Sequence, residues 1–318
     1  MAMPSCNRDP HFSDPSSTPS LGQPLNSPYI IKPRARHTHT VILLHDVASN
    51  GRIFSHDLLT TGKTSAGKTL DYLFPGVRWV FPSAPRRPCH ALEHARIAAW
   101  FDVVNLKDPS LRQETQRKGL CTSAREMFTI LGWELKLVAP DKVVLGGMGQ
   151  GCAMALAILL SLGHKIGGVI GMSGFLPFQF ELEMNTAADS SSESESQTSV
   201  QSGARSARGS NSSMTSHDPA VKAHIFQRSL LQLASAEHPT KDETSYGTPV
   251  LLGHGAVDDV LRFPFGEQAA LALGTAEYEV DFKRYEDHGH GYKVPEQIDD
   301  IVEFMRRRVG IEPRGDSD

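Results

Sequence analysis

The sequence of 318 residues lacks the features that mark several special classes of protein. No stretch approaches about 18 consecutive apolar residues, and the first residues, MAMPSCNRDP, lack the charged-then-apolar pattern of a secretory signal. A formal net charge of −4 leaves no excess of basic side chains for a phosphate backbone. We therefore expect no integral membrane segment, no nucleic-acid partner, and a location in the cytoplasm or the nucleus.

Cysteine is also scarce. The sequence holds four cysteines: Cys6, Cys89, Cys121 and Cys152. Their wide spacing is typical of reduced thiols rather than of a disulfide scaffold, and no Cys-x-x-Cys pair indicates a zinc site. We expect free thiols and no cofactor.

Two segments are poor in apolar residues and explain why the chain is long for one α/β domain. Residues 1–27 are rich in Pro and Ser, and residues 189–216 are mostly Ser with Glu, Gln, Gly and Arg, so neither can bury a core. We expect a disordered tail at 1–27 and a single domain at 28–312. A Ser-rich, low-complexity insert is expected to interrupt that domain at about 185–245.

The Ser-rich insert allows two interpretations. Ser190 and Ser192 each stand three positions before a Glu, an acidic context that favours phosphorylation. The protein would then be an interaction scaffold that acts through the insert. An inert flexible loop is the simpler alternative.

Apolar patterns outside these segments alternate between strand and helix. Strands are expected at Tyr29–Ile31, Thr40–Leu44, Val77–Phe81, Val143–Leu145, Gly168–Met172, Thr248–Gly253 and Tyr278–Arg284. Helices are expected at Phe54–Leu59, Arg112–Leu131, Ala153–Leu160, Pro264–Leu273 and Pro295–Arg308. This alternation predicts a doubly wound, mostly parallel sheet flanked by helices.

Two short segments have competing interpretations. Gly62–Thr69, GKTSAGKT, matches a phosphate-binding loop letter for letter. Such a loop must follow a buried strand, whereas the preceding segment looks helical, so we expect a surface turn. The second segment, Ala99–Asp102, AWFD, is either a wall of a binding site or an aromatic pair packed in a loop.

The stretch Val143–Leu156, VVLGGMGQGCAMAL, predicts a strand, a sharp turn and a helix. In the nucleophile elbow G-x-S-x-G, two outer glycines allow a close backbone crossing and a central Ser is presented above the sheet. The outer glycines are Gly147 and Gly151. The central residue is Gly149, which has no hydroxyl to attack a carbonyl carbon.

Seven motifs between about Tyr29 and Val309 match one known family. They are LLHxxxSNG at Leu43–Gly51, FPGVRWVFPSAP at Phe74–Pro85, WFD at Trp100–Asp102, LGGxxQGCAxAL at Leu145–Leu156, GxSGxLP at Gly171–Pro177, LGHGxxDxV at Leu252–Val260, and GHxYKVPxxIDDIVEF at Gly289–Phe304. With them the chain resembles the phospholipase/carboxylesterase family that includes the acyl-protein thioesterases, particularly its fungal branch.

The resemblance implies an α/β-hydrolase fold and a serine hydrolase that cleaves carboxylic esters or the thioesters of acylated proteins. Carried over by position, Asp258 is the acid and His290 the base. The N–H groups of Val47 and Gln150 correspond to the oxyanion hole. The implied substrate is an acylated protein or a small ester or lipid.

This sequence departs from the family pattern at three places that the resemblance puts on one face of the site. The nucleophile position holds Gly149, and the family's His-Gly in the first loop is His45-Asp46. A carboxylate there would oppose negative charge on a substrate oxygen. At the third place, Gly291 follows His290, whereas the family usually has a bulky residue after this histidine. The pair before this Gly-His-Gly segment is Asp287-His288.

Substitute groups for the missing hydroxyl are poorly placed. Ser173 has a counterpart in the family beside the true nucleophile, which favours a structural role. Cys152 lies one residue beyond Gly151, where the helix has turned away, and is expected to be a buried small hydrophobic residue. A metal is the remaining alternative, with four candidate ligands but no metal-ligand helix spacing: His254, Asp258, His288 and His290.

The sequence therefore favours a family member with impaired or absent turnover, a pseudoenzyme that retains an acyl-binding pocket. Activity through unusual chemistry is one alternative, such as direct activation of water by the His–Asp pair. An interaction scaffold is the other.

Overall fold

The computed structural model describes residues 27–187 and 217–315. Seven strands form one sheet in the order β1-β3-β2-β6-β7-β8-β9, and every neighbouring pair is parallel except β1 with β3. Their bounds are β1 Tyr29–Ile31, β2 His39–Leu44, β3 Val77–Phe81, β6 Val143–Met148, β7 Gly168–Met172, β8 Val250–Gly255 and β9 Val280–Tyr285. A separate antiparallel hairpin joins β4 (Arg86–Cys89) to β5 (Ala95–Ala98).

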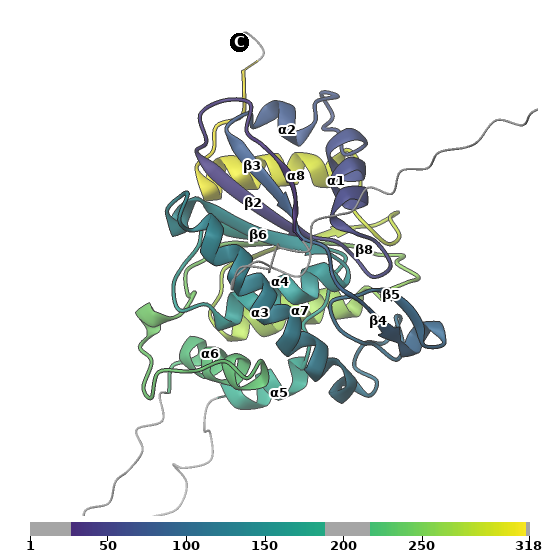
Figure 1. Cartoon of the computed structure of the whole chain (residues 1–318), viewed down its shortest axis with the longest axis vertical. Coiled ribbons are helices and arrows are strands. Elements are labelled where there is room, and N and C mark those ends of the chain that lie inside the picture. The colour runs from purple at the N-terminus through teal and green to yellow at the C-terminus, as the bar shows by residue number, and fades with distance from the viewer. Residues whose placement is uncertain (1–26, 188–216, 316–318) are drawn as a thin grey trace, which may run out of the picture.

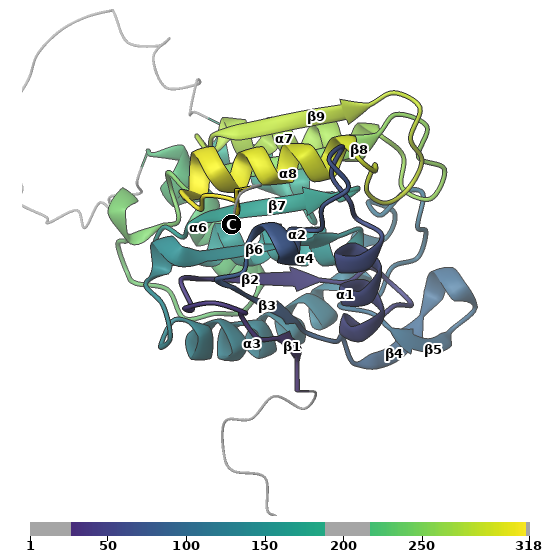
Figure 2. The ribbon, with the colours of Figure 1, turned by 90° about the horizontal axis from the view of Figure 1, so that it is seen from above.

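Helices cover both faces of the sheet (Figures 1 and 2). Helices α1, α2 and α8 lie on one face and α3, α4 and α7 on the other, with α5 and α6 packed outside α7 and α4. Their bounds are α1 Gly51–Thr60, α2 Leu70–Leu73, α3 Arg117–Glu134, α4 Gln150–Ser161, α5 Gln179–Thr186, α6 Pro219–Leu230, α7 Pro264–Thr275 and α8 Glu296–Phe304. The predicted doubly wound, mostly parallel sheet is confirmed.

The apolar patterns explain the central layers. All six residues of β2 are buried, as expected for a strand with both faces covered, and all twelve residues of α4 are buried. Two apolar clusters fill the space on the two sides of the sheet, one built around α4 and the other around Phe54, Trp79 and Ile298. The sheet is therefore a rigid base for the loops at its edges.

Strand β6 runs further than the sequence predicts. Gly146 and Gly147 were expected to end it, but they pair with β2 and β7 and the strand continues to Met148. A Cβ on Gly146 would lie 2.2 Å from the backbone oxygen of Ile170. Glycine is used here because of this close approach, and hydrogen bonds on both sides override its low strand propensity.

Other differences come from tertiary context. Strand β8 continues through His254 and Gly255, two residues beyond the predicted end at Gly253. The proline-rich loop after β3 contains the β4–β5 hairpin, in which Pro88 pairs with Arg96. Proline has no backbone N–H, and it is tolerated here because the strand is an edge strand. The last helix ends in a π-helical turn at Met305–Val309, and the expected helix at Arg112–Leu131 begins with a 3₁₀ turn.

The predicted insert is shorter than the sequence suggests. The expected range of about 185–245 contains helix α6, which packs into the core with Ala220 and Ala223 fully buried. The Asp218 side chain caps this helix by accepting the N–H groups of Ala220 and Val221. The low-complexity assignment is therefore wrong for residues 217–245. The tail at 1–26 and the segment 188–216, with Ser190 and Ser192, lie outside the described residues, so the phosphorylation and scaffold hypotheses stay predictions.

Gly62–Thr69 forms a surface turn, as predicted. It follows α1 rather than a strand, and Lys63 and Thr69 bridge across it. The resemblance to a phosphate-binding loop is therefore one of letters alone. Among the described residues, no helix is both long and apolar enough to cross a membrane.

Deletion of residues 189–216 is predicted to leave the thermal midpoint nearly unchanged, because a Ser-rich segment buries little and loop closure depends only weakly on length. Ala223→Asp, which buries a charge in α6, is the reference for a packed position and should cost more than about 2 kcal/mol. Thermal unfolding of the three proteins tests this. A deletion as damaging as Ala223→Asp would mean that the segment is packed.

Candidate active site

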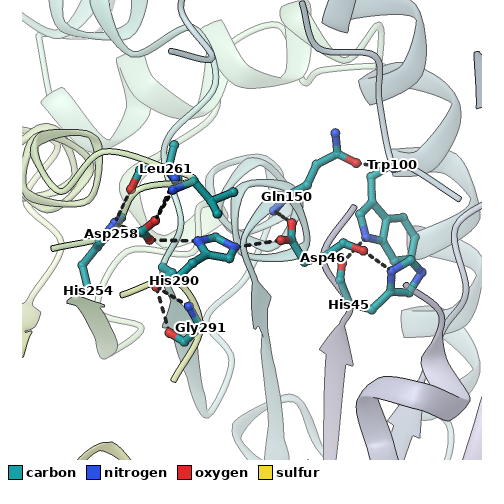
Figure 3. Close-up of polar contacts among 11 residues, drawn as sticks. His45, Asp46, Trp100, Gln150, His254, Asp258, Leu261, His290 and Gly291 are labelled. Atoms are coloured by element: carbon teal, nitrogen blue, oxygen red, sulfur yellow. Dashed lines mark hydrogen bonds and ion pairs between the residues drawn. The ribbon is translucent and has the colours of Figure 1, made fainter. Parts of the chain in front are cut away.

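Four loops meet at the carboxyl-terminal edge of the parallel strands. They follow β2, β6, β8 and β9 and carry Asp46, Gly149, Asp258 and His290. Figure 3 shows Asp46, Asp258 and His290 close together. Parallel strands bring all their carboxyl ends to one edge, which is where open α/β sheets place their ligands. Four positions that the sequence singled out thus come together.

His290 and Asp258 form a direct pair. The imidazole Nδ1 lies 2.8 Å from Asp258 Oδ2 (Figure 3). The backbone N–H groups of Val260 and Leu261 donate to Asp258 Oδ1 at 2.9 and 2.8 Å, so the carboxylate is held by its own loop. This is the contact that the family resemblance predicts.

His254 lies behind this pair. Its Nε2 is 3.3 Å from Asp258 Oδ2 and 3.0 Å from the carbonyl oxygen of Leu261. Burial alone would raise the pKa of Asp258, but the hydrogen bonds from His254, His290 and the Leu261 N–H outweigh it and hold that pKa well below its usual range. Asp258 is therefore an anion that orients His290.

Asp46 makes the contact that defines this site. Its Oδ2 lies 2.9 Å from His290 Nε2, and its Oδ1 accepts the N–H of Gln150 at 2.7 Å (Figure 3). The imidazole thus lies between two carboxylates. Both ring nitrogens face acceptors, so each carries a proton and the ring is an imidazolium.

The pKa of His290 reflects these two partners. Burial lowers it, and the hydrogen bonds and charges of Asp258 and Asp46 more than reverse that effect and raise the pKa of His290 to about 10. The resting site therefore holds a cation between two anions at neutral pH. A histidine in this state has no free lone pair with which to act as a base.

Gly149 and Asp46 are fitted to one another. Gly149 lies at the turn between β6 and α4 with φ 54° and ψ −119°, a conformation that favours glycine. A Cβ there would lie 2.1 Å from Asp46 Oδ1 and 2.2 Å from Asp46 Cγ. The Asp46 carboxylate therefore occupies the space that any side chain at position 149 would need.

The backbone between β6 and α4 makes a close crossing at Gly147 and Gly151. A Cβ on Gly147 would meet the Gly151 backbone at 2.6 Å, and one on Gly151 would meet the Leu44 oxygen at 2.1 Å. The start of α4 thus crosses the end of β2 at very close range. This crossing brings Asp46 to the first N–H of the helix.

A buried network fixes the Asp46 loop (Figure 3). His45 Nδ1 donates to the Asp46 carbonyl oxygen at 2.6 Å, and its Nε2 accepts the Ala84 N–H at 2.9 Å. Burial lowers the pKa of His45, which keeps the ring neutral and fits these two roles. The loop therefore enters the site in one conformation.

Trp100 and Gln150 complete the same network. Trp100 Nε1 donates to the His45 carbonyl oxygen at 2.8 Å, and its backbone N–H donates to the Gln150 side-chain oxygen at 2.6 Å. Gln150 Nε2 donates in turn to the Phe101 carbonyl oxygen at 2.8 Å. The AWFD segment is thus an aromatic pair packed behind the site, one of the two interpretations left open by the sequence.

The other candidates have supporting positions. The Ser173 hydroxyl bonds the carbonyl oxygen and the N–H of Gly291 at 2.8 and 3.1 Å, which anchors the His290 loop, and Gly291 has φ 113°. Cys152 is buried, and burial raises the pKa of its thiol to about 12. Both structural expectations are confirmed: neither side chain can act as a nucleophile in its present place.

No group of three or more His, Cys, Asp and Glu side chains in the described part of the chain is arranged to hold a metal ion. Burial lowers the pKa of His288, and its Nε2 has no hydrogen-bond partner among the described groups. The three free cysteines within the described ranges, Cys89, Cys121 and Cys152, are all buried.

A small apolar pocket opens beside Asp46 and His290. Its volume is about 30 Å³, room for one or two water molecules. Its lining residues are Asp46, Val47, Val103, Leu106, Pro109, Gly149, Gln150, Phe175, Val260, Leu261 and His290. A larger hollow of about 360 Å³ shares Pro109 and Phe175 with it and continues along Leu176, Phe178 and Phe180.

The sheet order, the elbow and the His–Asp pair define an α/β-hydrolase. Residues 25–194, more than half of the chain, match the family model described as Phospholipase/Carboxylesterase. The protein belongs to this phospholipase/carboxylesterase family, whose members hydrolyse carboxylic esters and thioesters.

Relatives agree with this assignment. The chain is 24% identical over 284 residues to acyl-protein thioesterase 1 of Yarrowia lipolytica, covering 88% of this chain and 96% of that protein. It is 32% identical over 154 residues to acyl-protein thioesterase 1 of Schizosaccharomyces pombe, covering 48% of this chain and 62% of that protein. The crystal structure of Zea mays acyl-protein thioesterase 2 shares the fold, with a TM-score of 0.59, 22% identity, and coverage of 90% of this chain and 100% of that chain.

The contact of Asp46 with His290 is the feature that the sequence did not predict. The resemblance predicted that Asp46 lies near the oxyanion hole. It did not predict that the Asp46 carboxylate accepts the Gln150 N–H and also contacts His290 Nε2. One signal could have suggested it. A glycine at position 149 and a carboxylate at position 46, on loops expected to meet, could have indicated that the two fit one another.

His290 is predicted to titrate near pH 10 in the wild-type protein and at a distinctly lower pH in Asp46→Asn, because one of its two anionic partners is removed. A folded-state pKa raised above the unfolded value of about 6.5 adds stability that is fully present below that value. This stability is lost as the pH rises through about 10. The imidazole resonances of His290 and the thermal midpoint between pH 6 and pH 10.5 should show both effects.

The control for this titration is Asp71→Asn. Asp71 is as exposed as Asp46, at 13% of its side chain, but is paired with Arg34 far from the site. The Asp71→Asn variant should leave the pKa of His290 unchanged. A wild-type His290 that titrates near pH 6.5 would show that the two carboxylates do not hold the imidazolium.

Proposed function

We propose that this family member has lost serine-dependent ester and thioester hydrolysis and retains a site for acyl chains. The observation that carries the proposal is the Asp46 carboxylate, which lies on the Gln150 N–H and on His290 Nε2. In a serine hydrolase these groups serve the substrate oxyanion and the serine hydroxyl. Here one side chain of the protein itself takes both.

The assigned positions support this loss. Gly149 stands at the nucleophile position, Asp258 and His290 at those of the acid and the base, and Val47 and Gln150 at those of the oxyanion hole. A carboxylate on the Gln150 N–H withdraws that donor, and one lost oxyanion donor costs on the order of 3 to 4 kcal/mol in a transition state. Neither a nucleophile nor a free oxyanion hole is left for acyl transfer.

The apolar walls favour retained binding. Val103, Leu106 and Phe175 line the pocket beside Asp46, and none of them depends on a serine. The hollow of about 360 Å³ that shares Pro109 and Phe175 with this pocket gives room for a chain. The Asp46 carboxylate disfavours a fatty-acid anion and tolerates uncharged groups such as an ester, a thioester or an alcohol. The proposed ligand is therefore the acyl chain of an acylated protein or of a small ester or lipid. The expected location remains the cytoplasm or the nucleus.

Restored activity is predicted to need two substitutions. In Gly149→Ser the new Cβ collides with the Asp46 carboxylate, and a non-glycine residue in this backbone region costs about 1 to 3 kcal/mol. This variant should unfold at a lower temperature and stay inactive. The double variant Gly149→Ser with Asp46→Gly removes the collision and frees the Gln150 N–H. It should hydrolyse p-nitrophenyl esters and acyl thioesters far faster than either single variant or the wild type.

Initial rates, labelling by a fluorophosphonate and unfolding midpoints of all four proteins test this prediction. Gly132→Ser, at a helix position where a Cβ meets no atom within 4 Å, is the control for the substitution itself. Serine labelling in the wild-type pocket would refute the loss of serine chemistry. A folded but inert double variant would refute the roles assigned to His290 and Asp258.

Acyl binding is predicted to survive without turnover. A long-chain thioether analogue of an acyl thioester should bind saturably to the wild-type protein, and more tightly than the fatty-acid anion of the same length. Leu106→Asp, which puts a charge in the pocket wall, should abolish binding. Leu111→Asp, the same change at a side chain that is 49% exposed and outside the wall, should not. Calorimetric titration of the three proteins decides it, and equal binding by both variants would refute the assigned pocket.

A further inference from the structure

We propose that Asp46 is itself a nucleophile, and that the site hydrolyses epoxides with an apolar substituent to diols through a covalent ester on Asp46. This activity goes beyond the proposed function and is a different reaction from that of the family. It follows from where the carboxylate lies and from which of its partners can carry protons (Figure 3).

The two carboxylate oxygens of Asp46 have different partners, so that one is held in place while the other can attack a carbon atom. Oδ1 accepts the Gln150 N–H at 2.7 Å and is held at the start of α4. Oδ2 faces His290 Nε2 at 2.9 Å, and the Asp46 side chain lines the small pocket. Each carboxylate oxygen has two lone pairs, so Oδ2 keeps one for a carbon atom while it pairs with the imidazolium. The side chain is 13% exposed and can be reached from the pocket.

The nature of a carboxylate selects the substrate class. Attack on an ester or thioester carbonyl would form an anhydride, which is more reactive than the substrate that made it. Attack on a saturated carbon forms an ordinary ester, a stable covalent intermediate. The electrophile must therefore be a saturated carbon with a leaving group. The imidazolium beside it favours a leaving group that needs a proton, which is the oxygen of an epoxide.

In the first step Asp46 Oδ2 forms a bond to a ring carbon of the epoxide. The C–O bond of the ring breaks, and its electron pair stays on the departing oxygen. That oxygen takes the proton of His290 Nε2. The products are a neutral hydroxyalkyl ester of Asp46 and a neutral imidazole whose Nδ1–H still faces Asp258 at 2.8 Å.

This step also changes the state of His290. The imidazole is held as a cation by two carboxylates, with a pKa of about 10. Esterification of Asp46 removes one of the two negative charges, which lowers the pKa of His290 in the intermediate. The same residue is thus an acid in the first step and has a free lone pair for the second.

In the second step water attacks Asp46 Cγ and gives a proton to His290 Nε2. The negative charge that forms on Oδ1 is held by the Gln150 N–H. The Cγ–Oδ2 bond then breaks, and Oδ2 leaves as part of the diol with the proton from His290. The remaining acid proton on Asp46 passes to His290, which restores the ion pair. The pocket has room for such a water beside the ester.

The pocket walls define the rest of the substrate. Val103, Leu106, Val260 and Leu261 surround the carboxylate with apolar surface. Gly149 adds no side chain next to Asp46, so the path to Oδ2 is bordered by backbone on that side. These walls favour an uncharged epoxide, since a charged one would lose its hydration. An alkyl or aryl substituent finds room in the larger hollow of about 360 Å³ that shares Pro109 and Phe175 with the pocket.

The experiment uses the full-length protein with styrene oxide and with 1,2-epoxydodecane. Diol formation by the wild type should exceed that of Asp46→Asn by at least about 100-fold, since nucleophile and proton transfers are both lost. His290→Gln removes both the acid of the first step and the base of the second, so its diol formation should fall as far as that of Asp46→Asn. The covalent ester is instead trapped by an acid quench of the wild-type protein during turnover. Peptide mass spectrometry should then find one added epoxide on the peptide that contains Asp46, and none on the Asp71 peptide, whose carboxylate is equally exposed.

A single turnover in H₂¹⁸O, with protein in excess, identifies the attacking atom. Attack by Asp46 leaves ¹⁸O in its carboxylate and none in the diol. The label in the diol instead would mean that water attacks the epoxide directly, which overturns the proposal. Equal diol formation by wild type and Asp46→Asn, or equal labelling of Asp71, overturns it as well. Both ligands use the pocket beside Asp46, but the thioether titration measures binding without chemistry and the diol assay measures chemistry, so the two proposals can fail independently.

Discussion

The imidazolium of His290 between two carboxylates is the interaction on which the site depends. Asp258 and Asp46 are both largely removed from water, and two such anions near one another would repel. The cation between them attracts both and offsets one of the two negative charges, and the N–H groups of Val260, Leu261 and Gln150 bond the remaining oxygens. Removal of the His290 charge would leave two buried carboxylates without a cation, which costs far more than loss of an exposed pair.

Asp46 and Gly149 depend on one another through space and through the backbone. The first N–H of α4 has no partner within the helix, and the Asp46 carboxylate supplies one where the helix dipole also favours an anion. That carboxylate fits only because position 149 has no Cβ. Asp46 and Gly149 therefore form one structural feature, and both lie in loops at the edge of the sheet.

Several residues that resemble reactive groups are framework. Ser173 ties down the His290 loop, Cys152 lies beneath the elbow where Gly171 and Gly174 leave room for its sulfur, and His45 links two loops as a neutral ring. These contacts keep the His–Asp pair aligned. A site can thus retain the supporting structure of a hydrolase while the atoms available for chemistry differ.

The sequence by itself determined the sheet, the elbow and the family. Buried strands such as β2 and the glycine spacing around Gly149 are local patterns, and the family motifs placed Asp258 and His290 on one site. Tertiary structure alone decided that β6 continues through its glycines, that α6 belongs to the core, and that Asp46 turns onto Gln150 and His290. Those last two contacts join residues 104 and 244 positions apart in the chain. No local pattern encodes them, because they depend on how the ends of strands and helices are brought together in the folded sheet.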